Sequence, residues 1–204
     1  MKIICVGRNY AAHAKELNNA VEEQPVIFLK PETALIPGRQ PFFYPSFSND
    51  IHYETELVIR ISKVGKNIAE KFAHRYYDEL TLGIDFTARD LQQNLKSKGL
   101  PWELAKGFDG SAPVGTFIRK DHFGKPMNDL RFSMRMNGEE KQSGHTADML
   151  FSVDRIISFV SSFYTLKIGD LIFTGTPQGV GPVKQGDEIE AFLEGEKVLT
   201  VKIR

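Results

Sequence analysis

Short apolar runs separated by turn-forming residues dominate the chain and predict a protein built mainly from strands. Runs rich in Val, Ile and Phe and bounded by Gly, Pro, Asn or Asp are typical of buried strands. Such runs occupy residues 1–6, 25–30, 52–59, 80–84 and 171–174. Alternating apolar and polar residues predict two hairpins, one over 130–138 that ends in Asn137-Gly138 and one over 187–203 around Glu194-Gly195-Glu196.

Four segments have the composition or spacing of helices. Residues 11–17 are rich in helix formers but precede Asn18-Asn19, so the predicted helix has about two turns and is marginal without packing. Residues 69–80 and 87–99 also predict helices, the second with Thr87 as a possible N-cap. Residues 154–163 place apolar side chains at helical spacing and predict a core helix.

The order of these segments indicates the domain organisation and the fold class. The chain of 204 residues contains no repeat, linker or low-complexity segment, so we expect a single domain over residues 1–204. Residues 37–49, rich in Pro, Gly, Ser and aromatic residues, predict an irregular connection. We therefore expect an α+β protein with many strands and a few short helices.

Composition and charge exclude several functional classes. The 26 basic and 26 acidic residues cancel, so we expect no nucleic-acid partner and no anionic membrane surface as partner. Cys5 is the single cysteine and lies in an apolar run, which predicts a buried side chain and excludes an internal disulfide. No apolar segment has the length of a signal peptide core or a transmembrane helix, and on that basis we expect a cytoplasmic protein.

Three acidic residues are the first candidates for chemistry. Glu54 and Glu56 lie two residues apart in a predicted strand, so their side chains point to the same face. Asp85 follows the apolar run 80–84. Neighbouring carboxylates repel unless they share a proton or meet a cation, and an oxygen-only set suits Mg²⁺, Mn²⁺ or Ca²⁺. The alternative is that both glutamates lie on the solvated face of a half-buried sheet.

Other polar residues are candidates for proton transfer and ligand binding. His13 and Glu16 are three residues apart, so on a helix they form either a general base with its orienting carboxylate or a solvated surface pair. Lys106 follows Trp102 in an apolar context and is either a partly desolvated cation or a surface lysine. Lys30 ends a strand, and Thr176 lies in a glycine-rich turn that lacks the ending of a phosphate-binding P-loop.

Taken in order, these motifs resemble the fumarylacetoacetate hydrolase family, over nearly the whole chain. The matching segments are Gly7-Arg8-Asn9-Tyr10 with His13 and Glu16, Phe28-Leu29-Lys30-Pro31, His52 to Leu57, Asp85 to Gln92, Leu104-Ala105-Lys106, Thr174-Gly175-Thr176-Pro177 and Gly179-Val180-Gly181. Gly99-Leu100-Pro101-Trp102 and the compact C-terminal segment are most similar to the acylpyruvase branch of that family.

The resemblance implies a fold, a metal site and roles for the polar residues. It implies a mixed β-sandwich roll, a homodimer, and Mg²⁺ or Mn²⁺ held by Glu54, Glu56 and Asp85. It also implies that His13 and Glu16 form a catalytic dyad on a lid helix. Three more residues, Lys106, Gln92 and Thr176, would position substrate or water. Arg8 and Lys30 are further candidates for binding a substrate carboxylate.

These roles predict a metal-dependent hydrolase that cleaves the C–C bond of acylpyruvates, giving a carboxylate and pyruvate, and that also decarboxylates oxaloacetate. Both reactions pass through a pyruvate enolate, so one site serves both, with a small 2-oxo acid as substrate. Two alternatives remain open. One is an isomerase or decarboxylase of 2-hydroxyhepta-2,4-diene-1,7-dioate, and the other is a non-catalytic metal-binding dimer.

Overall fold

A mixed sheet of eight strands forms the centre of the structure, a computed structural model that describes residues 1–12, 23–37 and 40–204. The strands follow the order β2-β1-β12-β5-β6-β8-β3, and β9 pairs with β6. They are β1 (Ile3–Gly7), β2 (Val26–Lys30), β3 (Leu35–Pro37), β5 (Thr55–Ile61), β6 (Tyr77–Ile84), β8 (Ala112–Val114), β9 (Ile118–Arg119) and β12 (Leu171–Phe173). Parallel pairs, β1 with β12 and β3 with β8, occur beside antiparallel ones.

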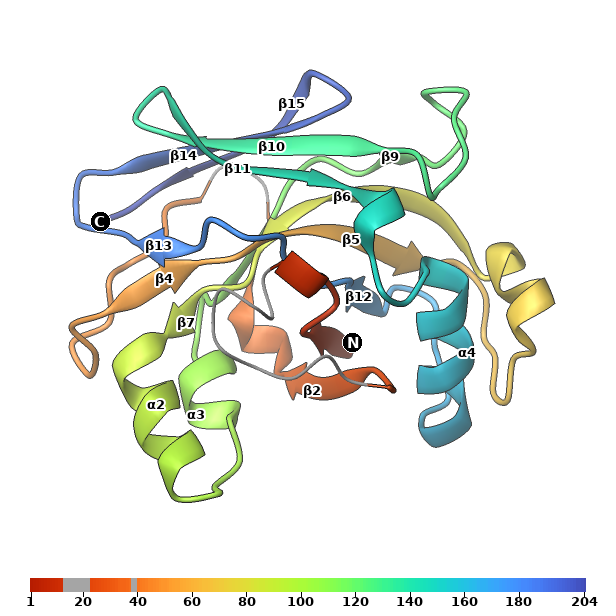
Figure 1. Cartoon of the computed structure of the whole chain (residues 1–204), viewed down its shortest axis with the longest axis horizontal. Helices are drawn as coiled ribbons and strands as arrows, with labels where there is room; N and C mark the ends of the chain where they lie inside the picture. Colours follow the sequence, from red (N-terminus) through yellow and green to blue (C-terminus); the bar gives the residue numbers. More distant parts are fainter. Residues whose placement is uncertain (13–22, 38–39) are drawn as a thin grey trace.

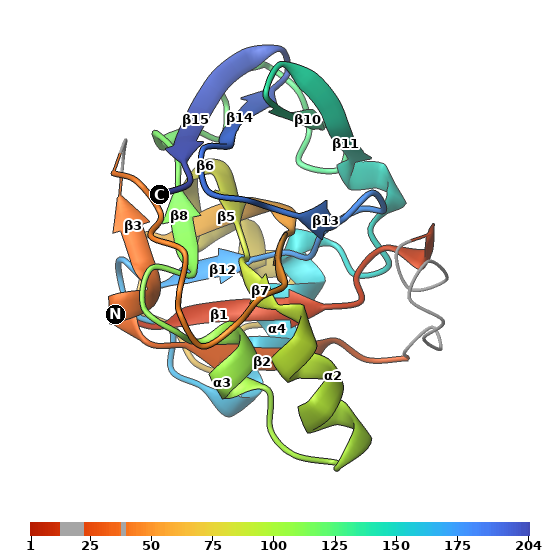
Figure 2. The ribbon, with the colours of Figure 1, turned by 90° about the vertical axis from the view of Figure 1, so that its left-hand side faces the viewer.

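Two smaller sheets complete the strand framework. An antiparallel sheet has the order β11-β10-β14-β15, and a small one has the order β13-β4-β7. Their strands are β10 (Arg131–Met136), β11 (Glu139–His145), β14 (Glu188–Leu193), β15 (Glu196–Lys202), β4 (Ile51–Tyr53), β7 (Thr87–Ala88) and β13 (Gly181–Pro182). The antiparallel sheet curls over one side of the central sheet (Figures 1 and 2).

The helices of the described residues are few and short. They are η1 (Glu32–Ala34), η2 (Glu70–Arg75), α2 (Arg89–Ser97), α3 (Glu103–Lys106), η3 (Thr146–Asp148) and α4 (Val153–Phe163). Helices α2 and α3 contact each other at one end of the molecule, and α4 lies at the other end (Figure 1). This arrangement confirms the predicted α+β class, with curled sheets and few helices.

The central sheet is buried on both faces, which explains why its strands are continuous apolar runs. Along β1, Ile4 packs into the large core between the sheets, while Ile3 and Cys5 pack into a second, smaller cluster. Along β5, Leu57 belongs to the large core and Val58 to the small one. Cys5 is fully buried, as predicted.

Both predicted hairpins and the core helix are confirmed. Asn137 and Gly138 join β10 to β11 with positive φ values of 54° and 82°, and Glu194 and Gly195 join β14 to β15 with φ values of 49° and 83°. Two consecutive residues with positive φ form the type I′ turn that matches strand twist. Helix α4 begins after Ser152, whose hydroxyl accepts a hydrogen bond from the Arg155 amide.

Two helix predictions need correction. The predicted helix over 69–80 is instead the short 3-10 helix η2 followed by strand β6, because residues 77–84 pair with β5 along the sheet. Strand pairing there overrides local helix propensity. The helix predicted over 87–99 begins at Arg89, since Thr87 and Ala88 pair with β4, and Thr87 is not the N-cap.

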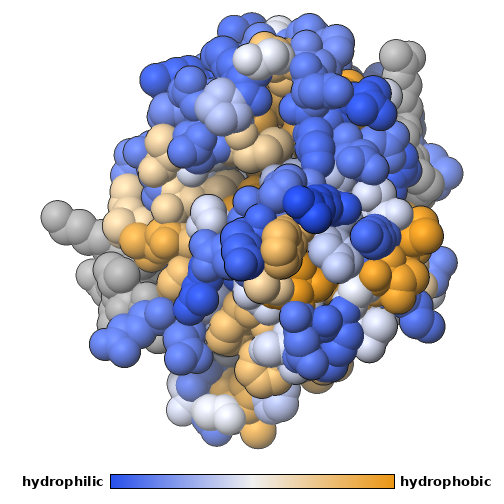
Figure 3. Space-filling view, turned by 90° about the vertical axis from the view of Figure 1, so that its right-hand side faces the viewer, coloured by the Kyte–Doolittle hydropathy of each residue, from blue (hydrophilic) through white to orange (hydrophobic). Residues whose placement is uncertain are grey.

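The end of the molecule that carries α4 presents hydrophobic groups among hydrophilic ones (Figure 3). Val64, Phe163 and Ile168 are among the large apolar side chains that are exposed, each by more than half. Exposed apolar side chains alone do not identify a partner, so the homodimer remains a prediction. None of the described helices is long and apolar enough to cross a membrane.

Candidate active site

The antiparallel pairing of β5 with β6 brings the three predicted metal ligands together. Glu54 directly precedes β5, Glu56 is its second residue, and Asp85 directly follows β6. In the register of the pair, Thr55 lies opposite Ile84, and the Asp85 amide donates to the Glu54 carbonyl at 2.8 Å. One carboxylate oxygen from each acid lies within 4.8 Å of the other two.

All three acids are buried, so the alternative of a solvated sheet face is wrong. Glu54, Glu56 and Asp85 are 6%, 2% and 1% exposed. Burial, followed by the neighbouring Asp85 and Glu54 carboxylates, raises the pKa of Glu56 well above its ordinary value. A buried, oxygen-only cluster under mutual repulsion fits a hard divalent cation, which would favour the charged form of each carboxylate.

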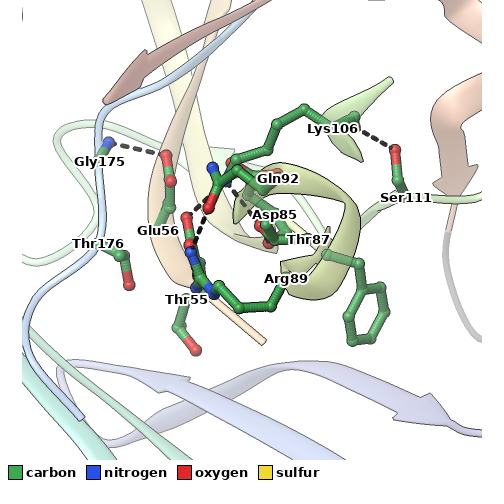
Figure 4. A network of polar contacts seen from close by, with 12 residues as sticks. Thr55, Glu56, Asp85, Thr87, Arg89, Gln92, Lys106, Ser111, Gly175 and Thr176 are labelled. Atoms are coloured by element: carbon green, nitrogen blue, oxygen red, sulfur yellow. Dashed lines mark hydrogen bonds and ion pairs between the residues drawn. The ribbon is translucent and has the colours of Figure 1, made fainter. Parts of the chain in front are cut away.

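Basic side chains contact two of these carboxylates, and Figure 4 shows two of the basic residues, Arg89 and Lys106. Lys106 Nζ lies 2.8 Å from Glu54 Oε2 and 2.7 Å from Asp85 Oδ2, and Lys30 Nζ lies 2.7 Å from Asp85 Oδ1. Arg89 Nη2 lies 2.6 Å from Glu54 Oε1. Each oxygen of Glu54 and Asp85 therefore contacts a cation, and Lys106 bridges the two residues.

Lys106 is a buried cation rather than a surface lysine. It is the last residue of α3 and is 3% exposed, and its Nζ also donates to Thr87 Oγ1 at 2.6 Å. Burial lowers the pKa of Lys106, but the Asp85 and Glu54 carboxylates outweigh burial and raise it above its ordinary value. Lys106 is therefore charged and adjacent to the predicted metal ligands.

Lys30 lies behind the acids rather than in front of them. Its ammonium is fully buried and donates to Ser111 Oγ at 2.9 Å and to the Ser111 carbonyl at 3.1 Å, in addition to its contact with Asp85. It also donates to the carbonyl of Lys106. These contacts hold α3 against Asp85. The role of Lys30 in binding a substrate carboxylate stays a prediction, because its ammonium contacts only groups of the protein here.

The glycine-rich turn after β12 supports Glu56. The Gly175 amide donates to Glu56 Oε2 at 2.7 Å, with Gly175 at a φ of 99° (Figure 4). A Cβ at this position would lie 2.6 Å from Asn9 Cβ, so glycine is needed for both conformation and space. Thr176 Oγ1 accepts a hydrogen bond from Gln142 Nε2 at 2.9 Å. The turn thus binds a protein carboxylate rather than a phosphate.

Asn9 fixes this turn to the rest of the protein. Its side-chain amide donates to the Thr174 carbonyl at 2.7 Å and to the Phe151 carbonyl at 3.0 Å, and its Oδ1 accepts from the Phe151 amide at 2.7 Å. Asn9 is fully buried. It therefore ties the end of β1 to the turn after β12 and to the segment before α4.

We expect Asn9→Ala to lower the free energy of unfolding by about 3 kcal/mol, because three buried hydrogen bonds of about 1 kcal/mol each are lost. Denaturant unfolding of the two proteins measures this difference. Asn128→Ala, at an exposed turn position without a positive φ, is the control. A loss for Asn9→Ala no larger than that of the control would contradict this account of the turn.

A narrow pocket lies in front of the acids, with a cavity volume of about 30 Å³, room for one or two water molecules. Among its lining residues are seven that the sequence predicts: Arg8, Glu54, Glu56, Asp85, Gln92, Lys106 and Thr176. Lys30 is not among them, and His13 and Glu16 lie outside the described residues. Arg89 Nη1 donates to Gln92 Oε1 at 2.7 Å, which leaves the Gln92 amide nitrogen as the donor end.

No role was predicted for the six other residues that line the pocket: Val6, Gly7, Phe28, Arg89, Lys96 and Trp102. A signal for two of them was present in the helix predicted over 87–99. Arg89, Gln92 and Lys96 are spaced by three and four residues, which places them on one face of a helix. The spacing of these polar residues in the sequence therefore marks the helix face that lines the pocket.

Sequence comparison relates the chain to oxaloacetate enzymes. Residues 2–204 match the family described as fumarylacetoacetate (FAA) hydrolase C-terminal. The mitochondrial oxaloacetate tautomerase FAHD1 of Mus musculus is 46% identical over 99% of this chain and 91% of its own length. The oxaloacetate tautomerase YcgM of Escherichia coli is 43% identical (98% and 91%), and the mitochondrial oxaloacetate decarboxylase of Dictyostelium discoideum is 46% identical (95% and 89%).

Solved structures show the same fold at high similarity. The fumarylpyruvate hydrolase of Pseudomonas aeruginosa, in complex with Mn²⁺ and pyruvate, superposes with a TM-score of 0.94 at 38% identity, covering 100% of this chain and 89% of that one. The 2-hydroxyhepta-2,4-diene-1,7-dioate isomerase of Mycobacterium marinum gives a TM-score of 0.86 at 37% identity, covering 99% and 73%. The predicted roll of curled sheets is confirmed by these matches.

The predicted cytoplasmic location is corrected by the comparisons, because the relatives from Mus musculus and Dictyostelium discoideum are named as mitochondrial proteins. The prediction rested on the absence of long apolar segments. That absence does not distinguish one aqueous compartment from another.

The family match, the similar relatives and the acid cluster all indicate the same family. The family match covers residues 2–204, the relatives are more than 40% identical over nearly their whole length, and the three acids that motif order predicted converge in one pocket. The chain belongs to the fumarylacetoacetate hydrolase family.

Proposed function

We propose that the protein is a divalent-metal-dependent enzyme that acts on short 2-oxo acids through their enol forms, with oxaloacetate as substrate. Relatives at 43% to 46% identity, over nearly the whole chain, are named oxaloacetate tautomerase or oxaloacetate decarboxylase. Tautomerisation was not among the activities predicted from the sequence. It nevertheless shares its enol with the predicted decarboxylation and hydrolysis.

The observation that carries this proposal is the buried cluster of Glu54, Glu56 and Asp85, with the Lys106 ammonium beside it in one pocket. A divalent ion held by the three acids, Mg²⁺ or Mn²⁺, would supply positive charge that stabilises enolate character in a 2-oxo acid. The Mn²⁺ in the Pseudomonas aeruginosa hydrolase structure supports this class of ion.

The protein's own groups would perform the remaining steps. Keto–enol exchange moves one proton between C3 and the 2-oxo oxygen, so no other atom is gained or lost. The Lys106 ammonium, held beside Glu54 and Asp85, would add positive charge near the oxygen on which charge develops. We assign the proton transfer at C3 to His13, oriented by Glu16, on the family resemblance of their motif.

Hydrolysis of acylpyruvates is the second candidate, supported by the fumarylpyruvate hydrolase structure that contains pyruvate. In that reaction His13 would deprotonate a water that attacks the distal carbonyl. The C–C bond then breaks to give a carboxylate and the pyruvate enolate, which gains a proton at C3 to form pyruvate. Isomerisation of 2-hydroxyhepta-2,4-diene-1,7-dioate is a third candidate because a solved neighbour is named as that isomerase.

We expect the purified protein to accelerate the enol-to-keto conversion of oxaloacetate. Metal removal should lower this rate by about 100-fold or more, because the charge of the metal stabilises the enolate by several kcal/mol. The assay follows enol absorbance in the ultraviolet, before and after EDTA and after Mg²⁺ or Mn²⁺ is restored. Pyruvate release from oxaloacetate and from acetylpyruvate is measured in parallel.

Metal ions without protein are the necessary control, because they promote enolisation of oxaloacetate themselves. Metal-dependent turnover of acetylpyruvate alone would shift the assignment to the hydrolase. Absorbance changes with 2-hydroxyhepta-2,4-diene-1,7-dioate alone would shift it to the isomerase. Turnover that persists at full rate in metal-free protein would contradict the proposal.

A further inference from the structure

Lys96 is a lysine of the pocket that neither the metal cluster nor the proposed chemistry uses. It lies near the end of α2, on the same helix face as Arg89 and Gln92, and lines the same pocket as the three acids. Its Nζ lies 5.0 Å from the centre of the Trp102 ring. Among the residues that the structure describes, no carboxylate forms an ion pair with it.

Trp102 lies near two cationic side chains that line the pocket, those of Lys96 and Arg8. The guanidinium carbon of Arg8 lies 6.0 Å from the centre of the same ring, and Arg8 also lines the pocket. An aromatic face attracts ammonium and guanidinium groups and restricts where they lie. The indole therefore keeps the half-buried Lys96 ammonium inside the pocket instead of letting it extend into solvent.

The electrostatic surroundings of Lys96 favour an anion. Burial, followed by the positive charges of Arg8, Arg89 and Lys106, lowers the pKa of Lys96, while the Glu54 carboxylate opposes this effect. Arg89 and Lys106 are already paired with the acids of the cluster. A negative group beside Lys96 would relieve the repulsion among these cations.

We infer that Lys96, held against Trp102, binds the second carboxylate of a dicarboxylic 2-oxo acid and so makes the site prefer dianionic over monoanionic substrates. This inference rests on the proposed function, in which the ion held by the three acids stabilises the enolate, so that the 2-oxo end of the substrate lies at the acid cluster. Lys96 then binds the carboxylate at the other end of the substrate, away from the acid cluster. It is a specificity residue and takes no part in proton transfer.

The test is the pair of variants Lys96→Gln and Lys98→Gln, because Lys98 is an exposed lysine two residues away, at the C-cap of α2. We expect Lys96→Gln to lower kcat/KM for oxaloacetate by about 10- to 100-fold, mainly through KM, as for loss of a charged hydrogen bond. For the monoanion acetylpyruvate we expect less than about a twofold change. Lys96→Arg should retain most of the preference, and Lys98→Gln should match the parent protein.

Binding measurements separate failure of this inference from failure of the proposed function. Calorimetry with Mn²⁺-loaded protein compares malate, a dianion, with lactate, a monoanion, and neither needs to react. We expect Lys96→Gln to weaken malate binding by about 10- to 100-fold and to leave lactate unchanged. Absence of oxaloacetate turnover in the parent protein would count against the proposed function, and the malate result would still decide the role of Lys96.

Two outcomes would overturn the inference. Equal losses for dianions and monoanions would mean that Lys96 supports the fold of α2 through its packing on Trp102. Unchanged malate binding in Lys96→Gln would mean that the second carboxylate lies elsewhere in the pocket.

Discussion

Glu56→Gln is expected to reduce metal-dependent turnover by about 1,000-fold or more and to abolish the rise in melting temperature that Mn²⁺ produces. The substitution removes one of three charged ligands, and metal charge stabilisation of an enolate contributes several kcal/mol. The glutamine oxygen can still accept the hydrogen bond from the Gly175 amide, which lies 2.7 Å from Glu56 Oε2. The fold should therefore survive.

The metal-free stability of this variant gives an independent prediction. Burial and two neighbouring carboxylates disfavour a charge on Glu56, so a neutral side chain of the same shape should leave the metal-free melting temperature unchanged or higher. Glu190→Gln, at a carboxylate paired with Lys197 on the second sheet, should alter neither turnover nor the response to Mn²⁺. These measurements use thermal unfolding with and without the ion.

The same variant separates an enzyme from a non-catalytic metal-binding scaffold. A scaffold would lose the stabilising effect of Mn²⁺ in Glu56→Gln but would show no turnover in the parent protein. Retention of full metal-dependent turnover by Glu56→Gln would contradict the assignment of Glu56 as a ligand.

Strand order along the chain was predictable, but the partner of each strand was not. The period-two pattern placed Glu54 and Glu56 on one face, and the position of Asp85 after an apolar run was visible in the sequence. What unites the three acids is the register of β5 with β6, which no local pattern contains. The residue pattern grouped Asp85 with the glutamates as an oxygen-only set, and the order of the family motifs assigned the three acids to one metal site.

Long-range contacts also explain the errors in the predicted helices. Residues 77–80 have side chains compatible with a helix, yet they belong to β6 because Leu80 lies opposite Ile59 in the core of the sheet. Thr87 is a good N-cap residue by type. It instead pairs with β4 and accepts a hydrogen bond from Lys106, a contact set by the position of α3.

Lys30→Met is expected to lower the free energy of unfolding by about 3–5 kcal/mol, the usual cost of removing one partner of a buried ion pair. The Lys30 ammonium is fully buried, 2.7 Å from Asp85 Oδ1, and the variant leaves that oxygen without its cation. It also removes the donors to Ser111 and to the carbonyl of Lys106. Denaturant unfolding measures the loss.

This variant distinguishes two roles for Lys30. If the lysine binds a substrate carboxylate, as its position at the end of β2 suggested, Lys30→Met should raise KM and leave stability intact. If it holds Asp85 and α3 in place, Lys30→Met should lower the free energy of unfolding, and Mn²⁺ should restore part of that loss by placing positive charge beside Asp85.

Lys2→Met is the matched control, because Lys2 pairs with the buried Asp170. The Asp170 carboxylate also accepts hydrogen bonds from the backbone amides of Lys2 and Lys167. Its smaller loss of stability should not respond to Mn²⁺, since Asp170 is not part of the acid cluster. A raised KM in Lys30→Met with parental stability would return Lys30 to the substrate site.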